Sequence, residues 1–302
     1  MNGQRMRLAP GRTGAICGIT YNRASAAIQS ARVSMGSIPL DLSIVFPARD
    51  EAPRLPRALE QATAYCRRRG LAYEIIVVDD GSRDETKAMA QQASRLDPAV
   101  RCVVLPENRG KGAAVREAMR HVSGRWILMS DVDLSTPLTE LDRLEVHREH
   151  ADVIIGSRAV VGSERLIRQS SSREWMGRGF NLAVRLLGLS GCHDTQCGFK
   201  LWSKAAASAV FPHLTIERFA FDVESLWLAR TFGFRILEVP VRWAHDAGST
   251  VNVPVDGARM TFDLLRLVVR ARVLQRVPSV SLTRLQTAAE DLARVGQAPR
   301  RD

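Results

Sequence analysis

Short apolar runs rich in Val and Ile recur along the first half of the chain, separated by segments whose apolar residues follow a helical spacing. Five such runs predict buried strands: Leu42–Phe46, Glu74–Val78, Arg101–Leu105, Trp126–Ser130 and Asp152–Ile155. Alternating strands and helices of this kind predict an α/β fold with a mostly parallel sheet flanked by helices. Sheets of this type bind their ligands at the carboxyl ends of the strands.

The helices between the first four strands have recognisable sequence signals. The first is predicted by apolar residues at helical spacing, Leu55, Leu59, Ala62 and Cys66. Ser82–Glu85 has the form of a capping box, which predicts that the second helix begins immediately after Gly81. A third helix is expected to follow Gly112.

The pattern changes after the fifth strand. The polar stretch Gly162–Arg173 is too long for an ordinary connection and predicts a mobile loop at the active site. Helices are then expected over Trp175–Leu187 and Asp222–Thr231, followed by a strand over Arg235–Val241. A last helix over Ala258–Val277 ends before Pro278.

The last helix has one narrow polar stripe on an otherwise apolar surface. The stripe consists of Arg259, Asp263, Arg266 and Arg270, and Leu, Val, Met and Phe fill most of the remainder. Such a helix could dock on anionic lipid headgroups, or it could pack on the core of the domain. The sequence leaves both interpretations open.

Length and composition predict one catalytic domain with appended segments. The 302 residues are 45% hydrophobic, which is enough for a single α/β core. We expect a disordered extension over residues 1–38, the catalytic domain over 39–257, the amphipathic helix over 258–278 and a weakly structured tail over 279–302. No run approaches the roughly 20 apolar residues of a membrane-spanning helix.

The charge narrows the choice of partners. With 43 Lys and Arg against 32 Asp and Glu, the net charge of +11 favours phosphates, anionic lipids or nucleic acid. Nucleic acid is not expected, because the chain lacks the aromatic platforms and motif spacing of its binders. The five cysteines have neither zinc spacing nor the pattern of a disulfide framework, which favours a reducing compartment.

Polar clusters follow three of the predicted strands and should converge on one edge of the sheet: Pro47–Glu51, Asp79 with Asp80, and Asp131 with Asp133. In an extended segment residues i and i+2 point the same way, so Asp131 and Asp133 can direct both carboxylates at one Mg²⁺ or Mn²⁺. An isolated Asp-x-Asp pair is more common in turns and helix caps. Its position after a buried strand favours the metal site.

Two further segments have both a structural and a functional interpretation. Asp79 and Asp80 could form a turn, or a carboxylate there could accept hydrogen bonds from a base or ribose. In Asn108–Gly112 the glycines would let backbone amides approach an anion, to which Lys111 adds charge. A plain loop is the alternative for this segment.

These segments together resemble the inverting family 2 glycosyltransferases with the GT-A fold, a Rossmann-like architecture. The resemblance spans about residues 40–275 and lies in Pro47–Glu51, Val77–Ser82, Asn108–Gly112 and Ser130–Asp133. Gly156–Arg158 and Asp194–Lys200 narrow it to enzymes that glycosylate dolichyl or polyprenyl phosphate. Residues 194–200 are more similar to the β-glucosyl branch than to the mannosyl branch.

The resemblance implies roles for the residues at the edge of the sheet. Pro47, Ala48 and Glu51 would lie along the nucleobase, and the Asp79–Asp80 pair would contact base or ribose. Lys111 and Asp131 would hold the nucleotide. Asp133 would ligate the metal, with Ser135 as a weak neutral neighbour where some relatives have a further ligand.

The resemblance also implies where the acceptor reacts. Arg158 would face the acceptor phosphate or the donor diphosphate, and Asp194 would lie nearest the reacting centre, as an orienting or closing residue. Asp194 could instead cap the turn before Gly198. Asp222 and Glu224 could supply a base for a hydroxyl acceptor, or be ordinary helix residues.

The expected function is therefore metal-dependent, inverting transfer of glucose from UDP-glucose to a polyprenyl phosphate. The alternatives are GDP-mannose as donor, a non-lipid glycan acceptor, and a nucleotide-sugar sensor without turnover. Such an enzyme would be cytoplasmic and peripheral at the inner face of the cytoplasmic membrane, meeting its lipid substrate from the surface.

Overall fold

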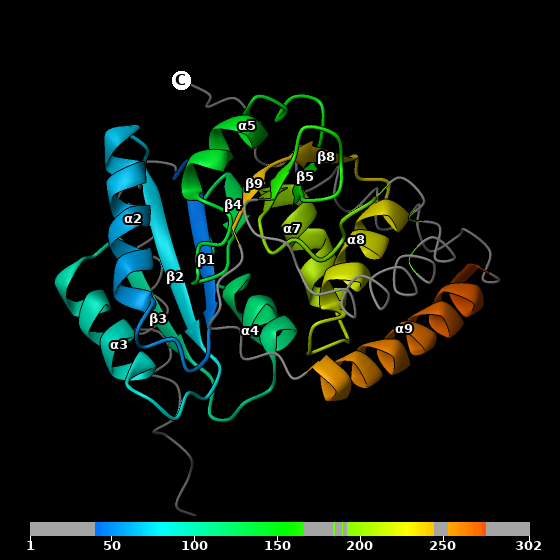
Figure 1. Cartoon of the computed structure of the whole chain (residues 1–302), viewed down its shortest axis with the longest axis horizontal. Coiled ribbons are helices and arrows are strands. Elements are labelled where there is room, and N and C mark those ends of the chain that lie inside the picture. The colour runs from blue at the N-terminus through cyan, green and yellow to red at the C-terminus, as the bar shows by residue number, and fades with distance from the viewer. Residues whose placement is uncertain (1–39, 166–183, 185–188, 190–191, 245–252, 276–302) are drawn as a thin grey trace, which may run out of the picture. The chain divides into compact units, whose positions relative to one another are not determined.

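A seven-stranded sheet forms the centre of the computed structural model, which describes residues 40–165, 184, 189, 192–244 and 253–275 (Figure 1). The strands lie in the order β3-β2-β1-β4-β7-β5-β8. They are β1 (Leu42–Ala48), β2 (Tyr73–Asp79), β3 (Val100–Val104), β4 (Trp126–Met129), β5 (Val153–Ser157), β7 (Lys200–Ser203) and β8 (Ile236–Pro240). The five strands predicted in the first half of the chain, and the later one over β8, are confirmed.

The sheet is mostly parallel, as predicted. β1 pairs in parallel with β2 and β4, β2 with β3, and β5 with β8. β7 is the exception, because it runs antiparallel between β4 and β5. The sequence did not predict β7, since four residues that begin with Lys200 show neither an apolar run nor a clear alternation.

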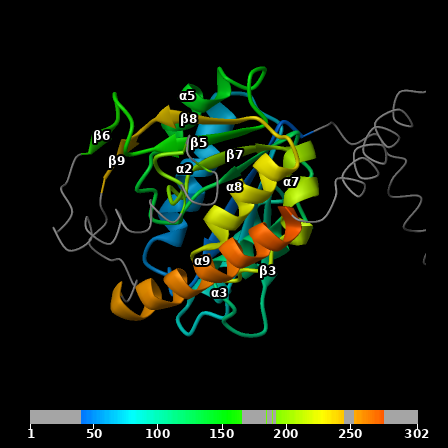
Figure 2. The same ribbon diagram turned by 90° about the vertical axis from the view of Figure 1, so that its right-hand side faces the viewer.

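Hydrophobic clusters cover both faces of the sheet. Neighbouring residues of β1 alternate between them, so that Val45 joins one cluster and Ile44 joins the other. The Val45 cluster includes residues of α4 (Lys111–Ala118), α7 (Lys204–Val210), α8 (Phe221–Thr231) and α9 (Val253–Gln275). The Ile44 cluster includes residues of α2 (Leu55–Arg68), α3 (Thr86–Leu96) and α5 (Leu141–Glu145). Figure 2 shows α8 and α9 together on one side of the sheet.

The predicted capping box is wrong, because α3 begins at Thr86. The Ser82 hydroxyl accepts a hydrogen bond from the Asp50 backbone N–H at 3.0 Å instead of capping a helix. Asp84 accepts from the Thr86 backbone N–H at 2.9 Å. Residues 81–85 therefore form a turn between β2 and α3 that is hydrogen-bonded to Asp50, just after β1.

The polar stretch Gly162–Arg173 is not entirely a loop. Glu164–Arg165 forms the short strand β6, which pairs in parallel with β9 (Arg242–Trp243). The remainder of that stretch lies outside the described residues. So do most of the helix predicted over Trp175–Leu187, the expected N-terminal extension over 1–38 and the tail over 279–302.

Helix α9 begins five residues earlier than predicted and has two apolar faces. Leu264, Leu267 and Ala271 are buried in the core, so the packing interpretation of this helix is correct. On the outside, Phe262, Leu265 and Val269 are 59%, 60% and 63% exposed. None of the described helices is sufficiently long and apolar to cross a membrane.

Candidate active site

The carboxyl ends of β1, β2 and β4 meet at one edge of the sheet, as the polar clusters predicted. β1 lies between β2 and β4, and Ala48 is opposite Asp79 in the β1–β2 register. The backbone pairing of β1 and β2 continues by one residue beyond β2, because the Asp80 backbone N–H donates to the Ala48 carbonyl oxygen at 2.9 Å. The residues that follow these strands therefore share one small region, which we call the carboxylate rim.

Asp131 and Asp133 follow β4 at this rim. The Lys111 ammonium lies 2.5 Å from Asp131 Oδ1, and the side chain of Asp131 remains 40% exposed. Burial disfavours the charged carboxylate, but Lys111, Lys200 and Arg158 together keep the pKa of Asp131 below its ordinary value. Burial also opposes the charge on Lys111, but Asp131 and Asp222 outweigh it and raise the pKa of the ammonium.

Asp133 lies in a more negative environment. Burial first, and then the charge of Asp131, raise the pKa of its carboxyl, although the backbone N–H of Ser135 donates to Oδ1 at 2.8 Å. Leu134 between them has a positive φ of 50°, which bends the chain after the second Asp. This local turn leaves a second carboxylate beside the first, where a cation would relieve the repulsion.

Gly198 contacts the Asp131 carboxylate, a relationship that the sequence did not reveal. A Cβ at residue 198 would overlap both oxygens of Asp131. The segment that leads into β7 can therefore reach Asp131 only because residue 198 has no side chain. The sole sequence signal was a glycine within the Asp194–Lys200 motif, and nothing local related it to Asp131.

Glu51 lies close to the same carboxylates. Its Oε2 is 2.6 Å from Arg54 Nε, and its backbone N–H donates to Thr86 Oγ1 at 2.7 Å. Burial raises the pKa of Glu51 to about 7, and the charges of Asp133 and Asp131 add to the shift, while Arg54 opposes it. Glu51 is thus coupled to the two Asp residues electrostatically as well as being placed near the end of β1.

Pro47 and Ala48 belong to β1 itself. Pro47 is half-buried, whereas the Ala48 side chain is 2% exposed and lies in the core. The Ala48 carbonyl oxygen accepts the hydrogen bond from Asp80. Ala48 therefore shapes the rim through its main chain, and its side chain packs in the core.

The two carboxylates at the end of β2, Asp79 and Asp80, differ in their environment. Asp80 accepts from the backbone N–H groups of Arg109 and Gly110, both at 2.8 Å, and from Asn108 Nδ2 at 2.6 Å. Burial raises the pKa of Asp80, although these two backbone hydrogen bonds lower it. Asp79 is buried, and its Oδ1 has no hydrogen-bond partner among the residues that the structure describes. Asp80 thus orders the loop that leads into α4 and Lys111.

Arg158 and Asp194 form a fork-like ion pair. Arg158 Nε donates to Asp194 Oδ2 at 2.7 Å and Nη2 donates to Oδ1 at 2.8 Å. The backbone N–H of Arg158 also donates to Oδ2 at 2.9 Å. Burial opposes ionisation of Asp194, but Arg158 lowers the pKa of its carboxyl below the ordinary value. The guanidinium lies 5.3 Å from the centre of the Trp243 ring.

Asp222 and Glu224 are engaged in buried contacts. Lys200 is fully buried and its ammonium bonds Asp222 Oδ1. Glu224 accepts from the backbone N–H groups of Thr215 and Ile216, at 2.9 and 2.7 Å, and from Arg270. These contacts assign Glu224 a structural role, so the interpretation of Glu224 as a free base is not supported.

The rim fits a hard divalent cation only in part. Asp131 and Asp133 offer oxygen ligands. The pKa of Asp133 is raised first by burial and then by the charge of Asp131, which a cation would offset. Within the described ranges, no group of three or more His, Cys, Asp or Glu side chains is arranged to hold a metal. The protein would therefore supply two carboxylates, and the phosphate oxygens of a substrate and water would supply the other ligands.

Known proteins resemble this chain in sequence and in fold. The family model "Glycosyl transferase family 2" matches residues 43–211. The dolichyl-phosphate beta-glucosyltransferases of Dictyostelium discoideum and Homo sapiens are 35% and 36% identical to this chain, over 76% of the chain and 75% of each relative. Among solved structures, glucosyl-3-phosphoglycerate synthase of Mycobacterium tuberculosis shares the fold at a TM-score of 0.57 and 17% identity, over 80% of this chain and 83% of that one.

The sheet has the GT-A fold, and the sequence matches are glycosyltransferases, so the class of the protein is that of a glycosyltransferase. The match over more than half of the chain, with relatives above 30% identity, identifies it further. The chain belongs to glycosyl transferase family 2.

Proposed function

We propose that the protein transfers glucose from UDP-glucose to a polyprenyl phosphate, with inversion at the sugar, and that Asp131 and Asp133 ligate the required Mg²⁺ or Mn²⁺. The observation that carries this proposal is the Asp131–Asp133 pair at the carboxylate rim, next to the Lys111 ammonium. The relatives named above support glucose as the sugar and a dolichyl-type phosphate as the acceptor.

The donor would lie along the ends of β1, β2 and β4. Pro47, the Ala48 main chain and Asp79 would border the nucleoside, while Asp80 would act by holding the Asn108–Gly110 loop. Lys111 would balance the charge of Asp131 and of the diphosphate. The metal would neutralise charge on the departing UDP.

The acceptor would need little help from a base. A phosphate monoester is already ionised near neutral pH, so positioning and charge neutralisation would carry most of the rate enhancement. In this scheme Asp194 fixes the guanidinium of Arg158 beside the reacting groups and removes no proton. The same scheme explains why neither Asp222 nor Glu224 needs to be free.

A lipid acceptor requires contact with a membrane surface. Phe262, Leu265 and Val269 form an exposed apolar row on α9, which we call the outer row. The net charge of +11 favours anionic headgroups. We therefore expect peripheral binding at the cytoplasmic face of the membrane in which the polyprenyl phosphate resides. Binding to vesicles with and without anionic lipid would test this location.

Calorimetry with UDP-glucose, UDP and GDP-mannose, with and without Mn²⁺, tests the donor and the metal. The uridine nucleotides should bind only with Mn²⁺, and Asp133→Asn should abolish that binding. Asp41→Asn is the matched control, because Asp41 pairs with Arg125 at the opposite end of β1. If GDP-mannose binds and neither UDP-glucose nor UDP does, UDP-glucose is rejected as the donor.

Transfer is then measured with UDP-glucose and a short polyprenyl phosphate in non-ionic micelles. A glucosylated lipid phosphate is the expected product. Product with a glycan or a small phosphate acceptor, and none with the lipid, would reject the polyprenyl acceptor. If the donor binds but is neither transferred nor slowly hydrolysed, the protein is a nucleotide-sugar sensor and the proposed enzymatic activity is rejected.

A further inference from the structure

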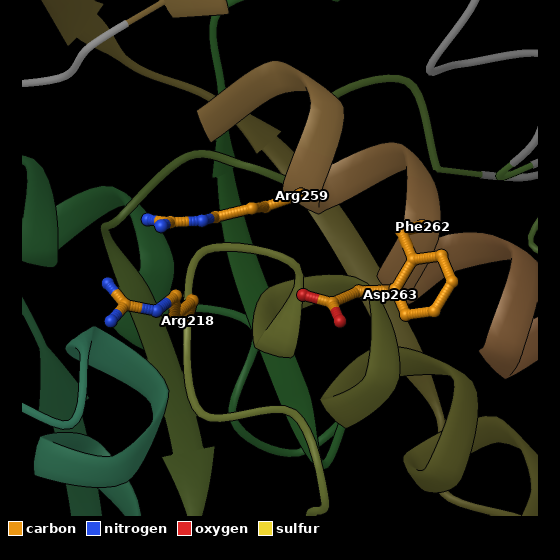
Figure 3. A pocket seen from close by; sticks show the side chains of 4 residues that line it. All are labelled: Arg218, Arg259, Phe262 and Asp263. Atoms are coloured by element: carbon orange, nitrogen blue, oxygen red, sulfur yellow. The ribbon is translucent and has the colours of Figure 1, made fainter. Parts of the chain in front are cut away.

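A pocket of about 460 Å³ lies between α9 and the loop that precedes α8. Arg218 lines it from the loop, and Arg259, Phe262 and Asp263 line it from α9. In Figure 3 the two guanidinium groups lie on the same side of the pocket, and the Asp263 carboxylate reaches toward them from the helix. None of these residues belongs to the carboxylate rim.

The charges of the pocket are unbalanced. Two guanidinium groups share it with one carboxylate. Arg218 is half-buried, yet neither Arg218 nor Arg259 makes a side-chain hydrogen bond or ion pair with another residue in the described part of the chain. By contrast, Arg270 on the same helix is paired with Glu224. Two unpaired guanidinium groups in one pocket favour an anion, and their planar donors suit phosphate oxygens.

The pocket adjoins the carboxylate rim. A Cβ at Gly110 would stand 2.8 Å from Arg218 Cγ and 2.6 Å from the Glu217 carbonyl oxygen, so the Arg218 loop packs directly on Gly110. The next residue is Lys111, which pairs with Asp131. Arg218 also lies close enough to Asp80 for its charge to lower the pKa of that carboxyl. An anion held by Arg218 would therefore be near the donor site.

The other side of the pocket leads to an apolar surface. Phe262 lines the pocket and is 59% exposed, and it begins the outer row of α9 that continues through Leu265 and Val269. A ligand with an anionic head and an apolar tail would contact both the guanidinium groups and this row. A free nucleotide or an inorganic anion has no apolar tail that could be buried against this row.

We propose that Arg218 and Arg259 bind the phosphate of the polyprenyl acceptor, and that Phe262 and the outer row of α9 contact its first isoprene units. This inference rests on the proposed function and assigns the acceptor site within it. The inference also gives the arginines different roles. Arg158 is held by Asp194, to which it donates through Nε and Nη2, whereas Arg218 and Arg259 line the pocket and would bind the acceptor phosphate.

Arg218→Met and Arg259→Met, singly and together, test the site by steady-state kinetics. UDP-glucose and Mn²⁺ are held saturating, and a short polyprenyl phosphate is varied in non-ionic micelles. Each substitution should raise the acceptor KM by about tenfold or more, since it removes a charge-assisted hydrogen bond. The dissociation constant of UDP should stay within about twofold of the wild-type value. Arg67→Met is the matched control, because Arg67 is an exposed residue of α2 that pairs with Asp97.

An unchanged acceptor KM would overturn the inference, whether kcat stays the same or falls. Weaker UDP binding with a normal acceptor KM would also overturn it, because it would assign the pocket to the donor. Unfolding is excluded by thermal melting, and Arg218→Lys should restore part of the acceptor affinity while keeping the charge.

Calorimetry with the short polyprenyl phosphate and with inorganic phosphate separates this inference from the proposed function. If the wild type binds the lipid phosphate more tightly than inorganic phosphate, and both methionine variants lose that binding, the pocket is an acceptor site even if no glucose is transferred. Equal affinity for both ligands would identify a general anion site and reject the role of α9. If no glucose is transferred and neither methionine variant loses lipid binding, both the proposed function and the acceptor site are rejected.

Discussion

The Asp131 carboxylate occupies the space that a Cβ at Gly198 would need, so that no side chain fits at residue 198. Asp131 follows the parallel strand β4, and Gly198 precedes the antiparallel strand β7 that pairs with β4. The two ends of this strand pair are thereby held together at the carboxylate rim. The geometry of the Asp131–Asp133 pair thus depends on a residue with no chemistry of its own.

Gly198→Ala should displace Asp131 and weaken binding of Mn²⁺ and UDP by about tenfold or more, because the new methyl group overlaps both carboxylate oxygens. Calorimetry of UDP with Mn²⁺ measures the effect. Gly70→Ala is a useful control: Gly70 has a φ of +62° but open space around it, so it should lose stability and keep UDP affinity. Normal UDP binding by Gly198→Ala would show that the rim tolerates this displacement.

Asp80→Asn distinguishes a loop-holding role from a direct contact with the nucleoside. The substituted amide cannot accept all three donors from Asn108, Arg109 and Gly110, so the free energy of unfolding should fall by roughly 1–3 kcal/mol. UDP affinity should fall with it, since the loop leads into Lys111. Urea unfolding and calorimetry measure the two effects, with Glu60→Gln at an exposed position of α2 as control. Lost affinity at unchanged stability would favour the direct contact.

The elements with strong local periodicity were predictable from the sequence. The buried Val and Ile runs predict β1 to β5, and the convergence of three polar clusters follows from parallel pairing. Two local signals failed because distant residues competed for them. Ser82 bonds Asp50 at the end of β1 instead of capping α3. Lys200 is buried in β7 because Asp222, far along the chain, neutralises it.

The residues that the sequence did not reveal at the site share one property. Gly198 and Lys200 are placed by partners that only the fold brings close, namely Asp131 and Asp222. The paired carboxylates, by contrast, were recognisable because their spacing and their position after a strand are local features. The order of motifs indicated the family, but it did not indicate which arginines are already paired.

Glu51 should make stability depend on pH in the absence of metal. Its pKa is raised to about 7 in the folded protein, against an ordinary value near 4.5, chiefly by burial. The folded state then holds this proton more tightly than the unfolded state does. Its contribution to stability is greatest below about pH 4.5 and is lost as pH rises toward 7, by roughly 2–3 kcal/mol in total.

Glu51→Gln removes this titration. The difference in unfolding free energy between variant and wild type should shift in favour of the variant as the pH rises from about 5 to 8. Urea unfolding in the presence of a chelator measures it at several pH values. Glu60→Gln is the control, because Glu60 is an exposed residue of α2. A difference that stays constant with pH would mean that Glu51 is ionised throughout this range.

The Arg158–Asp194 pair allows structural and catalytic roles to be separated. Asp194→Asn leaves the Arg158 guanidinium with a single acceptor oxygen, and breaking a buried pair costs about 3–5 kcal/mol of stability. The double variant Arg158→Met/Asp194→Leu removes both charges and should recover much of that loss. If Arg158 acts on the reacting phosphates, transfer should nevertheless remain lower by about a hundredfold or more in the double variant. Recovery of both stability and turnover would show that the pair only holds the fold. Urea unfolding and single-turnover assays on the wild type and both variants decide between the two roles.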